Sequence, residues 1–195
     1  MRADYIGRDM LGHVLAALTP ANALAIEVSA HTGLRIGDVL SLRTKDLKQR
    51  MSVRESKTGK RRRVYLPAPL YDRLLAQAGR LWVFDGRTDY RKHRTRQAVY
   101  KDVRRAARAL RLQEHVSPHS ARKYYAVERY HASGSLDAVQ RALLHSDPAV
   151  TAVYAMADAL TARKLAQADK ARRHRKPGQG APGGASPQGG GAAAR

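Results

Sequence analysis

Six side chains between residues 35 and 154 belong to types that bind or attack a phosphate. They are two arginines, two histidines, a lysine and a tyrosine, namely Arg35, Lys57, His119, Arg122, His145 and Tyr154. A phosphodiester undergoing in-line displacement gains negative charge on its non-bridging oxygens, and guanidiniums bind such oxygens bidentately without losing their own charge. Nearby cations lower the pKa of a tyrosine, which makes it a better nucleophile, and a lysine can protonate the leaving oxygen. The set therefore fits attack of a tyrosine on a phosphodiester.

The spacing of five of these residues supports a shared site. Arg35 follows a glycine break, at the expected start of a short helix. His119 and Arg122 are three positions apart, so they share one face of an expected helix. His145 follows an apolar pair at a helix end, and Tyr154 lies nine residues further on. Each residue alone also fits a structural role, such as a capping arginine or a core tyrosine, so the prediction rests on the whole set.

The sixth residue, Lys57, lies in an expected hairpin turn, where Lys60 is a second candidate for the same role. A lysine at a mobile tip could deliver a proton to an expelled 5′-oxygen. We find no cluster of carboxylates that would hold Mg²⁺, so the arginines would have to supply the charge stabilisation that a metal ion gives elsewhere. The sequence therefore predicts no metal and no cofactor.

The elements that must position these residues are expected to be mainly α-helical, with one small antiparallel β-hairpin, an α+β fold. Alternation of polar and apolar residues predicts the hairpin over residues 49–66, with its turn at 56–60. Apolar periodicity and capping residues predict helices at about 10–18, 20–31, from 36, 69–78, 94–111, from 118, 136–144, from 148 and 159–174. We expect one domain over residues 1–176, with its core at about 10–160, followed by a disordered Gly/Pro/Ala-rich tail at 177–195.

The charge of the chain indicates a polyanionic partner. It has 37 Lys and Arg residues against 16 Asp and Glu, a formal net charge of +21, which favours nucleic acid first and an anionic membrane surface second. In the helix expected at 94–111, Leu110 falls on the apolar face and basic residues gather on another. Our candidates for contact with double-stranded DNA lie in and just before this helix: Arg91, Lys92, Arg94, Arg96, Lys101, Arg105 and Arg108.

Several classes of protein are excluded. The chain has no cysteine, so disulfides, thiolate metal sites and a cysteine nucleophile are ruled out. No apolar stretch of 18 residues occurs, and the first residues lack the pattern of a signal peptide. We therefore expect a cytoplasmic, nucleoid-associated protein.

Four stretches together resemble the catalytic domain of the tyrosine recombinase (phage integrase) family. They are residues 32–43 (TGLRIGDVLSLR), the lysine hairpin from residue 56 to 67, residues 117–122 (SPHSAR), and residues 143–148 (LLHSDP) running on to Tyr154. Their order and the spacing from His145 to Tyr154 match the family over about residues 10–160. The resemblance implies the tyrosine recombinase catalytic-domain fold.

By this resemblance, the two arginines, the two histidines and Lys57 would surround a scissile DNA phosphate. Tyr154 would attack it to give a 3′-phosphotyrosyl intermediate, without metal or ATP, and Lys57 would act as general acid. Recombination of this kind needs four active sites on two duplexes, so we expect a homotetramer on double-stranded DNA. The helix after Tyr154 is the expected contact between subunits, because its Leu160 and Leu165 have no second domain to pack against. Fewer than 35 residues precede Arg35, so a minimal recombinase, a catalytic-domain fragment, and a chain that needs an accessory DNA-bending or core-binding partner all stay open.

Three positions depart from the family pattern. Leu144 stands where the family usually has glycine, Lys123 where it has histidine, and Asp38 where it has glutamate. These departures affect the fine geometry of the site more than its chemistry. Other functions also stay open: a type IB topoisomerase or DNA invertase with the same chemistry, a non-catalytic DNA-binding protein on the same scaffold, or a basic architectural or ribosome-associated protein. The sequence does not indicate the target site, or the choice among integration, excision, inversion and resolution.

Overall fold

The computed structural model describes residues 3–174, with side chains described through residue 170. Its elements in chain order are α1 (Arg8–Ala16), α2 (Pro20–Thr32), α3 (Ile36–Leu40), the 3-10 helix η1 (Thr44–Asp46), β1 (Arg50–Arg54), β2 (Arg61–Tyr65), α4 (Ala68–Gln77), α5 (Arg96–Ala109), α6 (Pro118–Ser133), α7 (Leu136–Leu143), α8 (Pro148–Ala155) and α9 (Ala157–His174). The described part is mainly α-helical with one two-stranded antiparallel sheet, which confirms the predicted fold class.

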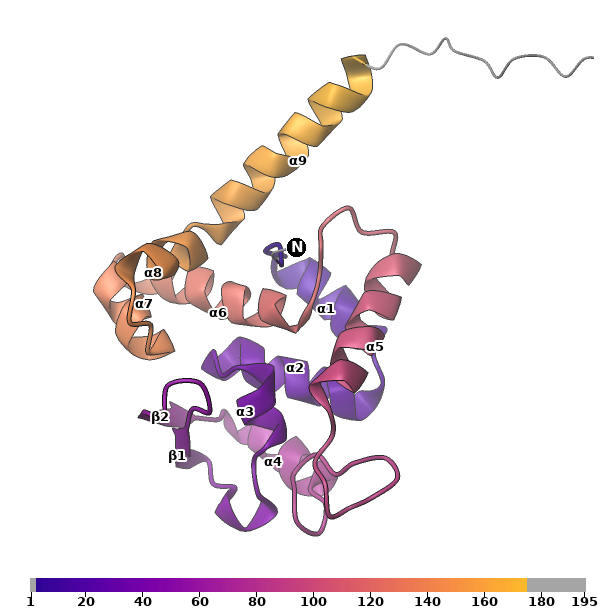
Figure 1. Ribbon diagram of the computed structural model, residues 1–195, viewed down its shortest axis with the longest axis vertical. Helices are drawn as coiled ribbons and strands as arrows, with labels where there is room; N and C mark the ends of the chain where they lie inside the picture. Colours follow the sequence, from indigo (N-terminus) through magenta and orange to yellow (C-terminus); the bar gives the residue numbers. More distant parts are fainter. Residues whose placement is uncertain (1–2, 175–195) are drawn as a thin grey trace, which may run out of the picture.

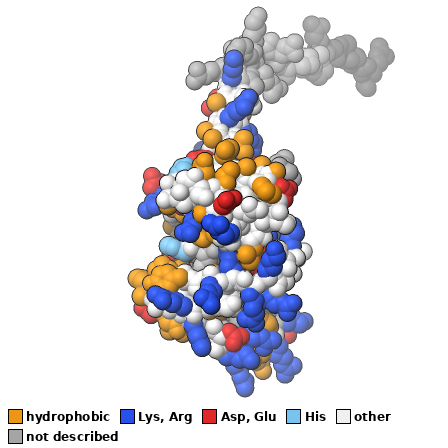
Figure 2. Space-filling model, turned by 90° about the vertical axis from the view of Figure 1, so that its left-hand side faces the viewer, with side chains coloured by type: hydrophobic (Ala, Val, Ile, Leu, Met, Phe, Trp, Pro, Cys, Tyr) orange, Lys and Arg blue, Asp and Glu red, His pale blue; other side chains and the backbone are white. Residues whose placement is uncertain are grey.

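The β1–β2 hairpin presents the turn that carries Lys57. Its strands pair antiparallel up to Arg54 opposite Arg61, and Gly59 in the turn has a φ of +68°, in the left-handed region that favours glycine. In Figure 1 the hairpin lies at the lower left, below α7. Figure 2 shows Lys and Arg side chains gathered over the lower part of this face.

The central helix α2 leads directly into the segment that carries Arg35. Its Ile26 and Val28 are at most 2% exposed, and the helix packs against α1, α3, α4 and α6. It ends at Gly33, whose φ is +67°. A Cβ atom at this position would lie 2.4 Å from Cδ1 of Tyr125 on α6. Glycine therefore both ends α2 and lets α6 approach the chain just before Arg35.

Helix α5 separates an apolar face from a basic one, as the sequence predicts. The Thr95 hydroxyl accepts a hydrogen bond from the Ala98 amide at 3.1 Å and so caps the first turn. Val99 and Val103 are at most 1% exposed. The prediction for Leu110 is wrong: the helix ends one residue earlier, and this side chain is 37% exposed because it lies beyond the last turn.

Helix α9 is fastened to the rest of the protein only near its beginning, among the described contacts. The Tyr5 amide donates to the Thr161 hydroxyl at 3.0 Å, and Lys164 Nζ donates to Asp4 Oδ2 at 2.5 Å. Beyond these contacts the helix extends away from the other elements (Figure 1), and Leu160 on it is 49% exposed. Within residues 3–174, no helix has a long enough apolar stretch to cross a membrane. The tail predicted at 177–195 lies outside the described residues.

Candidate active site

The six residues predicted to act on a phosphate come from five parts of the chain. Arg35 precedes α3, Lys57 lies in the β1–β2 turn, His119 and Arg122 lie at the start of α6, His145 follows α7, and Tyr154 lies near the end of α8. The structure places His145 in contact with both Arg122 and Tyr154. Arg35 is linked to Arg122 through the buried carboxylate of Glu55, which lies near both guanidiniums. Lys57 is exposed in the β1–β2 turn.

Arg122 is the buried centre of the site. It is 1% exposed, and its Nη2 donates to the Leu143 carbonyl at 2.7 Å and contacts His145 Nε2 at 3.3 Å. Its Nη1 donates to the Gly33 carbonyl. Because these carbonyls lie at the ends of α2 and α7, one guanidinium fixes both helices where a cation is favourable. Burial, and then the charge of Arg35, lower the pKa of Arg122 to about 10, which leaves it a cation at neutral pH.

Glu55 is a residue of this site that sequence reasoning missed. Its side chain is fully buried and forms an ion pair with Arg35. Its Oε1 lies 3.6 Å from Nη1 of Arg122 and has no hydrogen-bond partner among the described residues. Thr58 Oγ1 donates to Oε2 at 3.4 Å. In the sequence, Glu55 is the only acidic residue between residues 50 and 66. A single acidic residue in a basic hairpin is equally compatible with a solvent-exposed position, so its burial could not be predicted.

A second carboxylate fastens the lysine turn to α3. Asp38 is 1% exposed, and its Oδ1 accepts hydrogen bonds from the Ser56 amide at 2.9 Å and the Ser56 hydroxyl at 2.7 Å. The residue before Lys57 is thereby held against the helix that follows Arg35. The aspartate that departs from the family's glutamate is thus long enough to reach the turn.

His145 is held in its neutral form. Its Nε2 faces Nη2 of Arg122, which can only donate, so Nε2 accepts and the proton lies on Nδ1. Nδ1 then donates to Oγ1 of Thr151 at 3.3 Å, and that hydroxyl donates to the Asp147 carbonyl at 3.4 Å. Burial, followed by the charges of Arg122 and Arg35, lowers the pKa of His145 to about 4. Thr151, 1% exposed, is a further site residue that the sequence did not reveal.

Leu144, directly before this histidine, adopts the conformation that the family's glycine would favour. Its φ is +51° and its ψ is +38°, in the left-handed region, where it ends α7. A leucine in this region costs about 1 kcal/mol relative to glycine. The departure noted in the sequence therefore leaves the backbone turn in place at an energetic cost.

Tyr154 packs edge-on against His145. The two ring centroids are 5.1 Å apart with an interplanar angle of 77°. The tyrosine is half-buried and contacts the small apolar cluster formed by Ala126, Val139 and Leu143. Lys123 Nζ lies 5.8 Å from the centre of the tyrosine ring. The lysine found where the family has histidine therefore places a cation beside the expected nucleophile.

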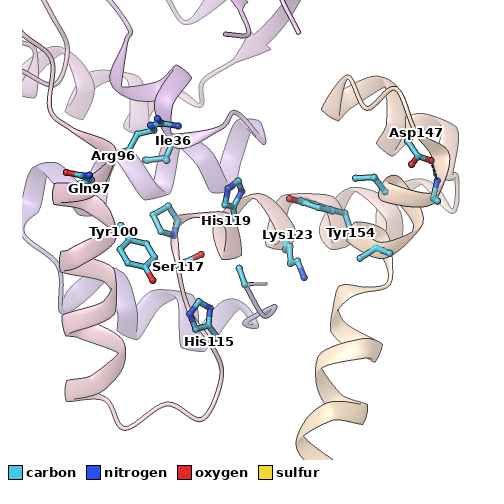
Figure 3. A pocket seen from close by; sticks show the side chains of 15 residues that line it. Ile36, Arg96, Gln97, Tyr100, His115, Ser117, His119, Lys123, Asp147 and Tyr154 are labelled. Carbon is cyan, nitrogen blue, oxygen red and sulfur yellow. Dashed lines mark hydrogen bonds between the residues drawn. The ribbon is translucent and has the colours of Figure 1, made fainter. Parts of the chain in front are cut away.

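A cleft of about 870 Å³ lies between α5 and α8, and of the six predicted residues it is lined by His119 and Tyr154. Figure 3 shows His119, Lys123 and Tyr154 on α6 and α8 facing Arg96 and Tyr100 on α5. Partial burial and the charges of Arg122, Arg35, Lys123 and Lys57 lower the pKa of His119. Ser117 and Ser120 form a capping box that begins α6 and so sets the position of His119.

The predicted DNA contacts divide into two groups. Arg94 and Arg105 hold the protein together: Arg94 is half-buried and donates to Asn22 Oδ1 at 3.1 Å, and Arg105 pairs with Asp102 at 2.7 Å and donates to the Ala17 carbonyl. Like Arg105, the other five are exposed, namely Arg91, Lys92, Arg96, Lys101 and Arg108. Within the described residues, no group of three or more His, Cys, Asp or Glu side chains could hold a metal ion.

This fold places a buried arginine cluster beside a histidine and a tyrosine, a set of side chains that is able to bind phosphate oxygens. The family model described as "Phage integrase family" matches residues 9–160. The "Probable integrase/recombinase YoeC" of Bacillus subtilis is 32% identical over 140 residues, which are 68% of this chain and 76% of that protein. The chain therefore belongs to the phage integrase family, the family of site-specific DNA recombinases.

Solved structures show the same fold. The XerA recombinase matches with a TM-score of 0.68 at 20% identity, over 90% of this chain and 67% of that one. A lambda integrase tetramer bound to a Holliday junction matches with a TM-score of 0.64 at 21% identity, over 79% of this chain and 48% of that one. The chain also spans about half the length of several other curated relatives that it matches.

Proposed function

We propose that this chain cleaves and rejoins DNA strands through a 3′-phosphotyrosyl intermediate, without metal or ATP. The observation that carries the proposal is the contact of neutral His145 with both buried Arg122 and the ring of Tyr154. Arg122 remains a cation while buried, so it binds phosphate oxygens in a site where water screens its charge poorly. A buried guanidinium, the imidazole that holds it and a phenol then meet at one phosphate.

In the proposed reaction, the Tyr154 oxygen attacks phosphorus, the P–O5′ bond breaks, and a P–O bond to tyrosine forms. His119 accepts the phenolic proton, because its lowered pKa leaves the ring unprotonated at neutral pH. Lys57 gives a proton to the departing 5′-oxygen. The charge that develops on the non-bridging oxygens is bound by Arg35 and Arg122, and His145 supports this by holding the Arg122 guanidinium through its accepting Nε2. A different 5′-hydroxyl then reverses the step and reseals the strand.

We further propose that the chain acts on double-stranded DNA at the nucleoid as a homotetramer, since strand exchange between two duplexes uses four active sites. Lambda integrase, which shares the fold, forms a tetramer on a Holliday junction, and this supports the same assembly here. Helix α9, with Leu160 49% exposed, is our proposed contact between subunits. The catalytic domain would extend over residues 1–176. An accessory DNA-bending or core-binding partner would supply the DNA contacts that this domain does not make by itself.

The test is formation of a covalent adduct on nicked duplexes from the neighbouring genomic sequence, stopped with SDS, in EDTA and without ATP. We expect an SDS-stable adduct that Tyr154→Phe abolishes while DNA affinity changes less than about twofold. The control is Tyr100→Phe, which alters another tyrosine that lines the cleft and should leave the adduct intact. An adduct that survives Tyr154→Phe or requires a divalent cation contradicts the mechanism.

The alternative functions give different results in the same assay. Intact binding with no adduct on any nicked duplex favours a non-catalytic DNA-binding protein on this scaffold. Relaxation of a supercoiled plasmid without strand exchange favours a type IB topoisomerase, and inversion of a segment between two sites favours a DNA invertase. Steeply salt-dependent binding in which Tyr154→Phe has no effect on any DNA product favours an architectural or ribosome-associated protein.

A further inference from the structure

A second cavity, of about 520 Å³, lies between the β1–β2 hairpin and helices α6 and α7. The charged residues that line it are all basic: His31, Arg62, Arg63, Arg129 and Arg141. Neither aspartate nor glutamate is among its lining residues. In Figure 1 the hairpin lies below α7 at the left of the molecule, the side that faces the viewer in Figure 2. The positive charge of this cavity is therefore not balanced by any carboxylate among its lining residues.

The floor of the cavity is a buried arginine held in a fixed position. Arg62 is 7% exposed, its Nη2 donates to the Thr32 carbonyl at 2.7 Å, and its Nη1 donates to the Ala142 carbonyl. Its Nε is buried and has no hydrogen-bond partner among the described residues. A buried donor without a partner is costly, so an acceptor that reached Nε would stabilise this arrangement.

Arg62 is also linked to the active site. It binds the carbonyls of Thr32 and Ala142, and Arg122 binds the carbonyl that follows each of them. The two buried guanidiniums therefore join the same two helix ends, one residue apart. One side of this pair faces the catalytic residues and the other lines the second cavity.

Three further arginines surround the cavity, each from a different element. Arg63 lies on β2, Arg129 on α6 and Arg141 on α7, and all three are exposed. Within the described residues, none of these three side chains forms an ion pair or a hydrogen bond, in contrast to Arg8, which pairs with a glutamate at the surface. The guanidiniums are therefore available to a ligand from outside.

We propose that this cavity binds a phosphate-bearing ligand with at least two negative charges, at a site separate from the active site. All its charged residues except one histidine are arginines and none is a lysine, which suits bidentate binding of phosphate oxygens. The cavity is large enough for a small ligand with two linked phosphates. Adjacent phosphates of a nucleic-acid backbone and a free di- or triphosphate share this chemistry.

The test is an NMR titration of the full chain with inorganic pyrophosphate, observing the arginine Nε–Hε signals. We expect saturable shifts of Arg129, Arg141 and Arg62. The double variant Arg129→Ala with Arg141→Ala should weaken this binding by about tenfold. The matched control, Arg87→Ala with Arg163→Ala, removes the same charge from exposed arginines outside the cavity and should leave it unchanged within about twofold.

Two further arms identify the source of the phosphate. A short oligonucleotide that shifts the same signals more tightly than pyrophosphate assigns the site to a nucleic-acid backbone, and the reverse order assigns it to a free polyphosphate. The proposal is overturned if pyrophosphate shifts only Arg35 and Arg122, if every exposed arginine responds without saturation, or if hexaglutamate binds the cavity more tightly than either phosphate probe.

Discussion

Glu55 and Arg35 form an ion pair in which the carboxylate is fully buried while the guanidinium is partly open to solvent, with its side chain 19% exposed. The same carboxylate lies 3.6 Å from Arg122, so one negative charge balances both arginines expected to bind the phosphate. Glu55 is also two residues from Lys57. It therefore joins the lysine turn to the arginine pair, and in this structure it occupies the guanidinium that a phosphate would otherwise engage.

The first prediction concerns Glu55→Gln. Removing the charge leaves Arg35 and buried Arg122 without their counter-ion, which should lower the free energy of unfolding by about 3 kcal/mol. The measurement is urea denaturation followed by circular dichroism. The control is Glu27→Gln, which removes a partly exposed carboxylate paired with Arg73 and should cost less than about 1 kcal/mol. If the two variants lose the same free energy of unfolding, then the buried ion pairs of Glu55 contribute no more to stability than the partly exposed pair of Glu27.

A second prediction follows from the neutral state of His145. Its pKa is lowered to about 4 in the folded protein, from an ordinary value of 6.5. Above pH 6.5 neither state is protonated at this residue, so its contribution to stability is constant. As the pH falls from 6.5 towards 4, the unfolded chain binds the proton first, and the folded state loses stability.

The measurement is the urea midpoint of wild type and His145→Gln across this pH range. We expect a midpoint that falls between pH 6.5 and 4 in the wild type and falls less steeply in the variant. Direct titration of the His145 ring by NMR should give a pKa near 4. Parallel curves for the two proteins, or a ring that titrates near 6.5, would contradict the hydrogen-bonding arrangement with Arg122.

Leu144 supplies a third prediction, because its left-handed backbone is strained. Leu144→Gly should relieve this strain and raise the free energy of unfolding by about 0.5–1 kcal/mol, less whatever apolar burial the leucine provides. The control is Leu110→Gly, which alters another helix-terminal leucine whose φ is −81°. That variant has no strain to relieve and should lose stability. A loss in both variants would mean that packing of Leu144 outweighs its backbone cost.

Much of the fold follows from local pattern, and this explains what the sequence could predict. The hairpin at 49–66 and the amphipathic helix α5 each carry their signal within one short stretch. The burial of Glu55 and Arg62 does not, because each is stabilised by groups more than ten residues away. Arg62 stands between two other arginines, and only the alternation of strand β2 turns it inward. The role of the Thr151 hydroxyl could not be predicted for the same reason. It contacts His145, and the position of His145 is set by Arg122, which is distant in the sequence.

The last prediction compares two glycines that end helices in the same backbone conformation. Gly33 and Gly134 have φ values of +67° and +63°, so replacing either by alanine incurs the same left-handed strain of about 1 kcal/mol. They differ in surroundings: a Cβ at Gly33 would lie 2.4 Å from the Tyr125 ring and 3.0 Å from Leu143, while nothing lies within 4 Å at Gly134.

Gly33→Ala should therefore lose about 1–3 kcal/mol more than Gly134→Ala, since α6 must move away from the end of α2. That movement would also disturb the carbonyl of Gly33 that Arg122 binds, so covalent adduct formation should fall in Gly33→Ala and stay near wild type in Gly134→Ala. The measurements are urea denaturation and the SDS-stable adduct assay under conditions where both variants are folded. If the two alanine variants lose the same stability and keep the same activity, then the close approach of α6 does not position Arg122.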